Sequence, residues 1–380
     1  MPDDISSGSA GTATNGRSRR RRGQRRPHKS NAQYYGAIDL GTNNCRLLIA
    51  RSMPGGFRVV DSYSNVVRLG AGLASTGKLS QTSMDAAVEA IQVCADKLKA
   101  KKVKRWRAIA TQACRQAENG AEFLARVKKE TGLTLDTISP RVEARLSVMG
   151  CINIIDRTKK VALVVDIGGG STELSWVDVR RLNAEDGQGR LHRPPISAWA
   201  SLPIGVVNLS EMYPEDHGDL AGWYQAMKDR VLAEIKAQGC ATRFANVFKD
   251  GDGHLVGTSG TVTSLASVHL KLPYYQRDKI DGIWTKTEDI VNTARSLSTM
   301  PLERRQSEPC IGAERATMLV AGCAIIDVLC ELWPSEKIRV ADRGLREGML
   351  MGLMNKTQIR KKPSPSEIKT DSKEAGTPNV

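Results

Sequence analysis

Two apolar hairpins with glycine-rich turns dominate the hydrophobic pattern of the chain. The first, AIDLGTNNCRLLIA, spans residues 37–50, and the second, LVVDIGGGSTELSWV, spans residues 163–177. In each, an apolar run ends at an Asp, a turn rich in Gly follows, and a second apolar run begins. This pattern predicts two buried strands joined by a tight turn. Asp39 and Asp166 lie 127 positions apart, a spacing typical of one α/β domain followed by a related one.

Strand-like and helix-like segments alternate along the rest of the chain, which predicts an α/β fold. Strands are predicted at residues 105–110 and 133–138, a second strand pair at 57–70, and a polar loop at 182–195. Helices are predicted from Ser80 to about Lys102, over 120–130 with Asn119 as cap, from Ser139-Pro140 onward, and over 318–333. Residues 256–268 predict a strand, a glycine turn and a helix start. That turn is compatible with a phosphate or nucleotide contact and equally with a helix entry that needs small residues.

The two glycine-rich turns are candidate phosphate sites. Glycine lets the backbone approach a ligand closely, so successive N–H groups can point at phosphate oxygens. Most glycine hairpins are only hairpins, but two copies with Asp at the same place are stronger evidence. Asp39 and Asp166 are candidate ligands of a hydrated Mg²⁺, and Arg46 and Arg115 are candidates to neutralise further oxygens. The expected phosphate contacts from the turns are Gly41, Thr42, Asn43 and Asn44 in the first, and Gly168, Gly169, Gly170, Ser171 and Thr172 in the second.

Composition narrows the class of protein. A chain of 380 residues with 40% hydrophobic and 26% charged residues is typical of about two soluble globular domains plus tails. No apolar stretch approaches a membrane span, and the first 16 residues lack the apolar core of a secretory signal. Eight cysteines without a C-x-x-C pair argue against a disulfide framework and for a reducing cytoplasm. The five histidines are scattered, which argues against a histidine metal site.

Of the net charge of +15, the first 33 residues contribute +6 and the rest of the chain +9. The first 33 residues hold eight Arg or Lys and two Asp residues and show no hydrophobic periodicity, so we expect a disordered basic tail. Two interpretations remain open. The tail either keeps the protein soluble or makes nonspecific contacts with polyanions.

Motif by motif, residues 34–356 resemble the exopolyphosphatase and guanosine pentaphosphate phosphohydrolase (Ppx/GppA) family, in its short form without the additional C-terminal helical domain. ATQACRQAEN matches the family's Thr–Arg–Asn segment, and ISPRVEARL matches the segment that carries its catalytic glutamate, here Glu143. The two hairpins match the family's phosphate loops, and SLPIGVVNLSE, GTSGTVTSLA, ERATMLVAG and GLREGML follow in the family's order. The chain departs from the family pattern at Thr42, Asn44, Asn208 and Thr317, where Ser, Ser, Arg and Asp are usual.

The resemblance implies two related actin-like (ribonuclease H-like) domains with a cleft between them. It places domain I at 34–157 and domain II at 158–342, with a segment at 343–356 that packs back onto domain I. Outside this core we expect the basic tail at 1–33 and a flexible tail at 357–380. The resemblance also implies that Glu143 is the catalytic base. Position alone would make a Glu early in a helix a solvated residue, although the helix dipole there favours an ionised carboxylate. Glu173 is a candidate to orient water or metal.

The implied activity is Mg²⁺-dependent release of terminal orthophosphate from polyphosphate, guanosine pentaphosphate or both. An ATP-dependent kinase of the same fold and a non-catalytic sensor of polyphosphate or guanosine nucleotides are the alternatives. The expected partners are a polyanionic phosphate substrate, no membrane and a second copy of the chain in a homodimer. The sequence does not rank the two substrates.

Overall fold

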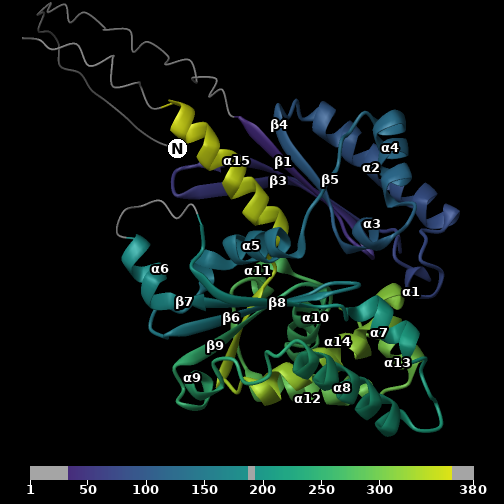
Figure 1. Ribbon diagram of the computed structural model, residues 1–380, viewed down its shortest axis with the longest axis vertical. Helices are drawn as coiled ribbons and strands as arrows, with labels where there is room; N and C mark the ends of the chain where they lie inside the picture. Colours follow the sequence, from purple (N-terminus) through teal and green to yellow (C-terminus); the bar gives the residue numbers. More distant parts are fainter. Residues whose placement is uncertain (1–32, 187–192, 362–380) are drawn as a thin grey trace, which may run out of the picture. The chain divides into compact units, whose positions relative to one another are not determined.

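The first glycine-rich hairpin begins a five-stranded sheet, whose strand order is β3-β2-β1-β4-β5 in the computed structural model (Figure 1). The structure describes residues 33–186 and 193–361, all of which belong to one compact unit. β1 pairs antiparallel with β2 and parallel with β4. The strands are β1 (Tyr34–Leu40), β2 (Asn44–Met53), β3 (Gly56–Val66), β4 (Arg105–Ala110) and β5 (Asp136–Thr137).

The second hairpin forms the middle of a six-stranded sheet of order β10-β11-β9-β6-β7-β8. β6 pairs antiparallel with β7 and parallel with β9, as β1 does with β2 and β4. Asp39 and Asp166 therefore hold equivalent positions one residue before the end of equivalent strands, as the repeated sequence pattern predicts. The strands are β6 (Val161–Ile167), β7 (Thr172–Asp178), β8 (Ile196–Leu202), β9 (Gly253–Thr258), β10 (Trp284–Lys286) and β11 (Lys337–Ala341).

Helices cover the outer faces of both sheets (Figure 1). In the described residues they are α1 (Leu73–Thr76), α2 (Gln81–Ala100), α3 (Gln112–Gln116), α4 (Gly120–Thr131), α5 (Pro140–Cys151), η1 (Ile152–Ile154), α6 (Val179–Asp186), α7 (Val206–Met212), α8 (Leu220–Ala237), α9 (Ala245–Lys249), α10 (Gly260–His269), α11 (Arg277–Ile280), α12 (Thr287–Ser298), α13 (Leu302–Ser307), α14 (Ala313–Leu332) and α15 (Leu345–Lys361). α2 and α4 pack on the first sheet, whose core includes Ile91 and Phe123. α8, α10, α12 and α14 pack on the second, around Trp176 and Trp333.

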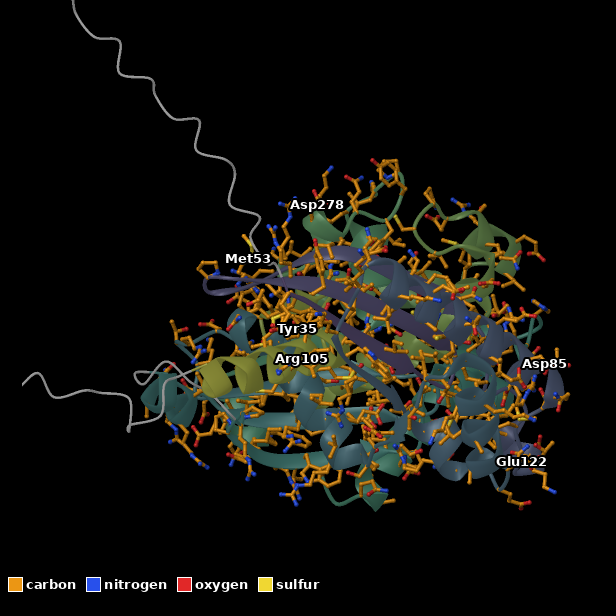
Figure 2. The ribbon with its side chains drawn as sticks, turned by 90° about the horizontal axis from the view of Figure 1, so that it is seen from above. Tyr35, Met53, Asp85, Arg105, Glu122 and Asp278 are labelled. Atoms are coloured by element: carbon orange, nitrogen blue, oxygen red, sulfur yellow. The ribbon has the colours of Figure 1, made fainter. Side chains whose placement is uncertain are left out.

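The inner faces of the sheets meet α5 and α15. Leu146 of α5 and Met349 of α15 share a core with Ala37 of β1, while Val148 of α5 packs with Val164 of β6. Tyr35 is buried in the same interior, whereas Glu122 and Asp278 lie on the periphery (Figure 2). One helix, α5, therefore belongs to the cores of both sheets.

Glycines bring α5 and α15 into backbone contact. A Cβ atom on Gly150 would lie 2.0 Å from the carbonyl oxygen of Gly344, and one on Gly348 would lie 2.0 Å from that of Leu146. Real Cβ contacts do not come this close, so the separation of the two helices depends on these glycines.

Most predicted element boundaries are confirmed. Ser80 accepts a hydrogen bond from the N–H of Ser83 at 3.2 Å and caps α2, and Ser139 caps α5 in the same way. All eight cysteines are free and buried. Among the described residues, no helix is long and apolar enough to cross a bilayer.

Several local predictions are wrong. Residues 57–70 do not form a strand pair: residues 57–66 belong to the single strand β3, which pairs with β2 with a register shift near Ile49, and residues 67–70 lie outside it. The strand predicted at 133–138 shortens to two residues, and residues 182–186 belong to α6. The C-terminal tail was predicted from residue 357, but α15 continues to Lys361.

Asn119 does not cap α4 as predicted. Its side chain forms no capping bond and instead exchanges two hydrogen bonds with the backbone of Leu79, at 2.9 and 3.0 Å. The predicted division into domains at residues 157–158 stays a prediction. The basic tail, with the polyanion contact suggested for it, and residues 362–380 lie outside the described residues, apart from Gln33.

We expect Gly348→Ala to lower the free energy of unfolding by about 2 kcal/mol or more, because the new methyl group would force α15 away from α5. Gly352→Ala, on the same helix with nothing within 4 Å of its Cβ position, is the matched control. It should raise stability by up to about 1 kcal/mol through helix propensity. Chemical denaturation of both variants measures the difference, and equal stabilities would show that the helix contact is not tight.

Candidate functional site

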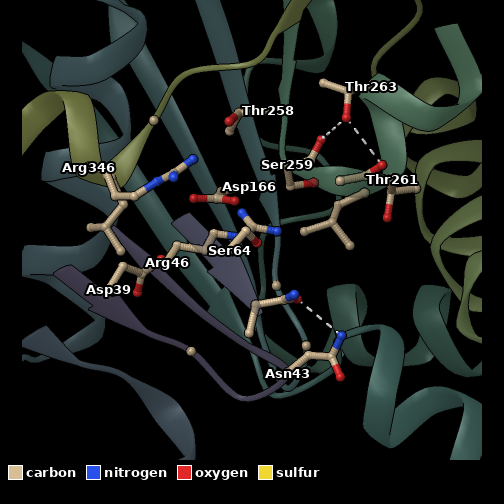
Figure 3. A pocket seen from close by; sticks show the side chains of 18 of the residues that line it. Asp39, Asn43, Arg46, Ser64, Asp166, Thr258, Ser259, Thr261, Thr263 and Arg346 are labelled. Atoms are coloured by element: carbon tan, nitrogen blue, oxygen red, sulfur yellow. Dashed lines mark hydrogen bonds between the residues drawn. The ribbon is translucent and has the colours of Figure 1, made fainter. Parts of the chain in front are cut away.

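A cavity of about 520 Å³ lies between the two glycine-rich turns (Figure 3). Its walls come from both hairpins, α5, the start of α10 and residues 342–347. All but two of the predicted site residues line it: Asp39, Gly41, Thr42, Asn43, Asn44, Arg46, Glu143, Asp166, Gly168, Gly169, Gly170, Ser171 and Glu173. The exceptions are Arg115 and Thr172.

The second turn presents its N–H groups to the cavity because its carbonyl groups are engaged elsewhere. The carbonyls of Gly168 and Gly169 accept hydrogen bonds from the backbone of α7, at 3.0 and 2.7 Å. The carbonyl of Gly170 accepts bonds from the side chains of Gln112 and Asn208, at 2.8 and 2.9 Å. In a trans peptide each carbonyl is opposed by the next N–H, so three successive N–H groups, those of residues 169–171, turn the other way.

The first turn is built on the same plan. The carbonyl of Thr42 accepts a hydrogen bond from the N–H of Gly70 at 2.8 Å, and that of Asn43 accepts bonds from the N–H groups of residues 67 and 68. These bonds direct the N–H groups of Asn43 and Asn44 away from the residues that follow β3. Two short rows of backbone donors thus line one cavity.

Gln112 joins the two turns and was missed by sequence reasoning. Besides its bond to Gly170, its carbonyl oxygen accepts a hydrogen bond from the Thr42 hydroxyl at 3.5 Å. A Cβ atom on Gly170 would lie 1.7 Å from that same oxygen, so a side chain there would displace the Gln112 amide. The signal was present in the ATQACRQAEN segment, directly after Thr111, but an amide between strand and helix has no chemistry of its own to single it out.

Four predicted phosphate contacts have other roles in the structure. The N–H groups of Gly41 and Gly168 donate across their own turns to the carbonyls of Asn44 and Ser171, at 2.9 and 2.8 Å. The Thr172 hydroxyl is fully buried and donates to the carbonyl of Ile204 at 2.7 Å, because residue 172 is already in β7 and faces the core. Arg115 donates to the carbonyl of Ile138 at 2.6 Å and forms an ion pair with Glu143 at 3.4 Å. Arg115 therefore acts on Glu143 rather than on the cavity directly.

Asn208 and Thr317, two of the four departures from the family pattern, differ in their surroundings. Asn208 caps α7 by accepting a bond from the N–H of Gly205 at 2.7 Å while it holds the carbonyl of Gly170, so it supports the second turn. Thr317 is exposed on α14, and its hydroxyl bonds only the local carbonyl of Glu314 at 3.4 Å.

Six carboxyl groups line the cavity, and burial raises the pKa of the four that were predicted site residues. The pKa of Asp39 rises to about 6, although the charges of Arg46 and Arg346 lower it. Burial and the charge of Asp166 raise the pKa of Glu173 to about 7, against hydrogen bonds from Ser171 and Ser201. The pKa of Glu143 lies well above its ordinary value because of burial and then the charge of Glu173, with Arg115 opposing both.

The Asp pair has the donor chemistry of a magnesium site. One oxygen of Asp39 is buried without a hydrogen-bond partner among the described residues. The other Asp, Asp166, accepts a hydrogen bond from the Ser147 hydroxyl at 2.5 Å, and burial raises its pKa. No cluster of three or more His, Cys, Asp or Glu side chains suited to a metal occurs in the described part of the chain. Two carboxylates fit Mg²⁺, which keeps several waters and is often completed by substrate phosphates.

A C-terminal segment also enters the cavity and was not singled out beforehand. Residues 342–347 connect β11 to α15, and their order is maintained by Glu347, which accepts bonds from Arg277 at 2.8 Å and from the N–H of Gly344 at 2.9 Å. Arg346 lines the cavity beside them. The GLREGML motif was the available signal, but nothing local relates it to residues 300 positions earlier.

The third glycine turn lines the cavity too. Ser259 has φ of 90°, which is rare for a residue with a side chain, and its hydroxyl is buried without a partner among the described residues. Its carbonyl accepts a bond from the Thr263 hydroxyl at 2.9 Å (Figure 3). A strained residue in a cavity wall favours a ligand contact over a simple helix entry, without identifying the ligand.

Paired strand–turn–strand units, each in a mixed sheet of its own with a cavity between them, define an α/β protein of two mixed sheets. The chain belongs to the Ppx/GppA phosphatase family, whose model matches residues 48–357. It is 28% identical over 327 residues to a guanosine-5'-triphosphate,3'-diphosphate pyrophosphatase of Aeromonas hydrophila. That match covers 85% of this chain but only 60% of the relative, so the chain spans about three fifths of the relative's length.

Solved structures agree with the family. The Aquifex aeolicus family member is 26% identical, with a TM-score of 0.68 and coverage of 87% of this chain and 99% of that one. An exopolyphosphatase-like protein is 25% identical, with a TM-score of 0.73 and coverage of 84% and 97%. The similarity therefore extends over both sheets and the cavity between them.

The raised pKa of Glu173 predicts a pH-dependent stability. Because the folded state holds the proton more tightly, the free energy of unfolding falls as pH rises from the unfolded pKa of about 4.3 towards 7. With metal chelated, Glu173→Gln should therefore be more stable than wild type at pH 8, by on the order of 1 kcal/mol or more, and not at pH 4. Glu89→Gln, at an exposed position of α2, should show no such gain. Parallel denaturation curves at both pH values measure this, and a gain at pH 4 alone would contradict it.

Proposed function

We propose that this chain is a Mg²⁺-dependent hydrolase of phosphoanhydrides that releases terminal orthophosphate from inorganic polyphosphate, guanosine pentaphosphate or both. The observation that carries the proposal is one cavity lined by both glycine-rich turns, Glu143 and the Asp pair. Because the turn carbonyls are bonded elsewhere, we infer that backbone N–H donors of both turns face this cavity. Such donors, fixed before substrate arrives, are the means by which proteins stabilise phosphoryl groups in transfer.

The roles follow from position. The N–H groups of Gly169, Gly170 and Ser171 bind oxygens of the terminal phosphoryl group, and those of Asn43 and Asn44 bind the adjoining phosphate. Asp39 and Asp166 would hold Mg²⁺, which when bound neutralises phosphate charge. Arg46 lines the same cavity and neutralises further oxygens.

Glu143 is the base in this proposal. Water attacks the terminal phosphorus, its proton passes to the Glu143 carboxylate, and the bond to the bridging oxygen breaks. The bridging oxygen leaves with the electron pair as the new end of the shortened chain, and orthophosphate is released. Burial raises the pKa of Glu143, which makes its carboxylate a stronger proton acceptor, and Arg115 pairs with that carboxylate at 3.4 Å.

The names of the relatives support both substrates, one pointing to a guanosine nucleotide and another to polyphosphate. A ratio of kcat/KM for the two substrates on the purified chain tests the proposal and ranks them. An ATP-dependent kinase would release no orthophosphate without an acceptor, and a sensor would release none at all. A homodimer remains part of the proposal, to be tested by sedimentation.

Glu143→Gln should lower kcat by about 10²-fold or more while KM changes little, since the amide keeps the shape but cannot take the proton. Glu122→Gln is a matched control, because Glu122 also lies in the first turn of a helix but is exposed. Orthophosphate release under saturating substrate measures both variants. A near-normal kcat in Glu143→Gln would remove this residue from the role of base.

Asp166→Asn should abolish turnover, and Asp39→Asn should reduce it strongly, because each removes a carboxylate from the metal site. Both should also weaken Mg²⁺ binding measured by calorimetry on the protein without substrate. Chelation of divalent cations should stop the wild-type enzyme. Full orthophosphate release in excess chelator would exclude the metal-dependent mechanism.

A further inference from the structure

Arg346 brings a second guanidinium group to the cavity from the far end of the chain. It lies in the first turn of α15, directly after the chain leaves β11 of the second sheet and returns to the first. Figure 3 shows its side chain extending towards Arg46, Asp39 and Asp166. All four residues line the same cavity.

The guanidinium of Arg346 has no hydrogen-bond or ion-pair partner within the described ranges 33–186 and 193–361, in contrast to its neighbours. Arg277 pairs with Glu347 at 2.8 Å, and Arg343 pairs with Asp281. Burial lowers the pKa of Arg346 and the charge of Arg46 lowers it too, whereas the carboxylates of Glu347, Asp39 and Asp342 raise it. Because the guanidinium lies near these carboxylates without bonding to any of them, its N–H donors are available to a ligand. The position therefore favours an anionic ligand between the two arginines.

The backbone that carries Arg346 is held firmly. The next residue, Glu347, is bonded to Arg277 and to the N–H of Gly344, which fixes the first turn of α15. One residue further, Gly348 touches the backbone of α5 at Leu146, three residues after Glu143. The spacing between Arg346 and the proposed base is therefore set by a rigid helix contact rather than by a loop.

We propose that Arg346 is a further catalytic residue that donates to the non-bridging oxygens of the phosphoryl group under attack and stabilises the charge that grows on them in the transition state. This inference rests on the proposed hydrolase function. Arg suits the role because its planar fork can bind two phosphate oxygens at once. Together with Arg46, it flanks the cavity with two fixed positive charges.

The decisive experiment is chemical rescue. Arg346→Ala should lower kcat by about 10²–10³-fold, as does the loss of other preorganised donors in phosphoryl or acyl transfer. Guanidinium chloride, well below denaturing concentrations, should restore part of kcat in Arg346→Ala but not in Glu143→Gln. Arg346→Lys, which keeps the charge but not the fork, should fall between Arg346→Ala and wild type. Arg145→Ala, an exposed arginine on α5, is the matched control and should behave as wild type.

Folding and binding are measured separately. Thermal melting reports whether each variant is folded, and calorimetry with inorganic tripolyphosphate in the Glu143→Gln background should show weaker binding when Arg346 is also replaced.

No orthophosphate release by wild type would overturn the proposed function itself. An active wild type with near-normal kcat in Arg346→Ala would overturn only the role of Arg346. The role of Arg346 would also be overturned if Arg346→Ala is folded but inactive, guanidinium restores none of its kcat, and Arg346→Lys has no higher kcat than Arg346→Ala.

Discussion

The site depends on the backbone contact between α5 and α15. α5 carries Glu143 and also Ser147, whose hydroxyl binds Asp166 of the second sheet, while α15 carries Arg346. The inner face of the first sheet packs on both helices, and the second packs on α5. Glu143 and Arg346, one from each helix, are thus positioned relative to both glycine-rich turns by one close-packed crossing. Packing at native density leaves this crossing little freedom to shift.

The charged groups of the cavity destabilise the ligand-free protein and favour the binding of a ligand. Burial raises the pKa of Asp39, Asp166, Glu143 and Glu173. Arg46 and Arg346 lie near these carboxyl groups and form no hydrogen bond or ion pair with other described residues. A divalent cation would satisfy the first set, and a phosphate chain would satisfy the second. A bound divalent cation and a bound phosphate chain would therefore each offset charges that have no partner in the ligand-free site.

Sequence reasoning predicts the features that depend on residues close together in the chain. The hairpins, the capped start of α5 and the Asp pair all follow from short patterns whose periodicity and turn chemistry survive folding. Gln112 and Arg346 could not be found this way, because their roles arise from contacts with residues far away in the chain. Thr172 was misplaced for a related reason, since one position along a strand decides whether a hydroxyl faces the cavity or the core. Asn119 was misread because the same side chain that can cap a helix can also bind a neighbouring loop.

The glycines at the helix crossing also set the width of the cleft. Gly150 and Gly348 leave only hydrogen atoms between the backbones of α5 and α15, so the inner faces of the sheets approach as closely as a helix layer permits. Any larger side chain there would push the two helices apart and would change the gap between the two glycine-rich turns without altering either of them. The width of the cleft can therefore be changed at the helix crossing, by residues that do not themselves line the cavity.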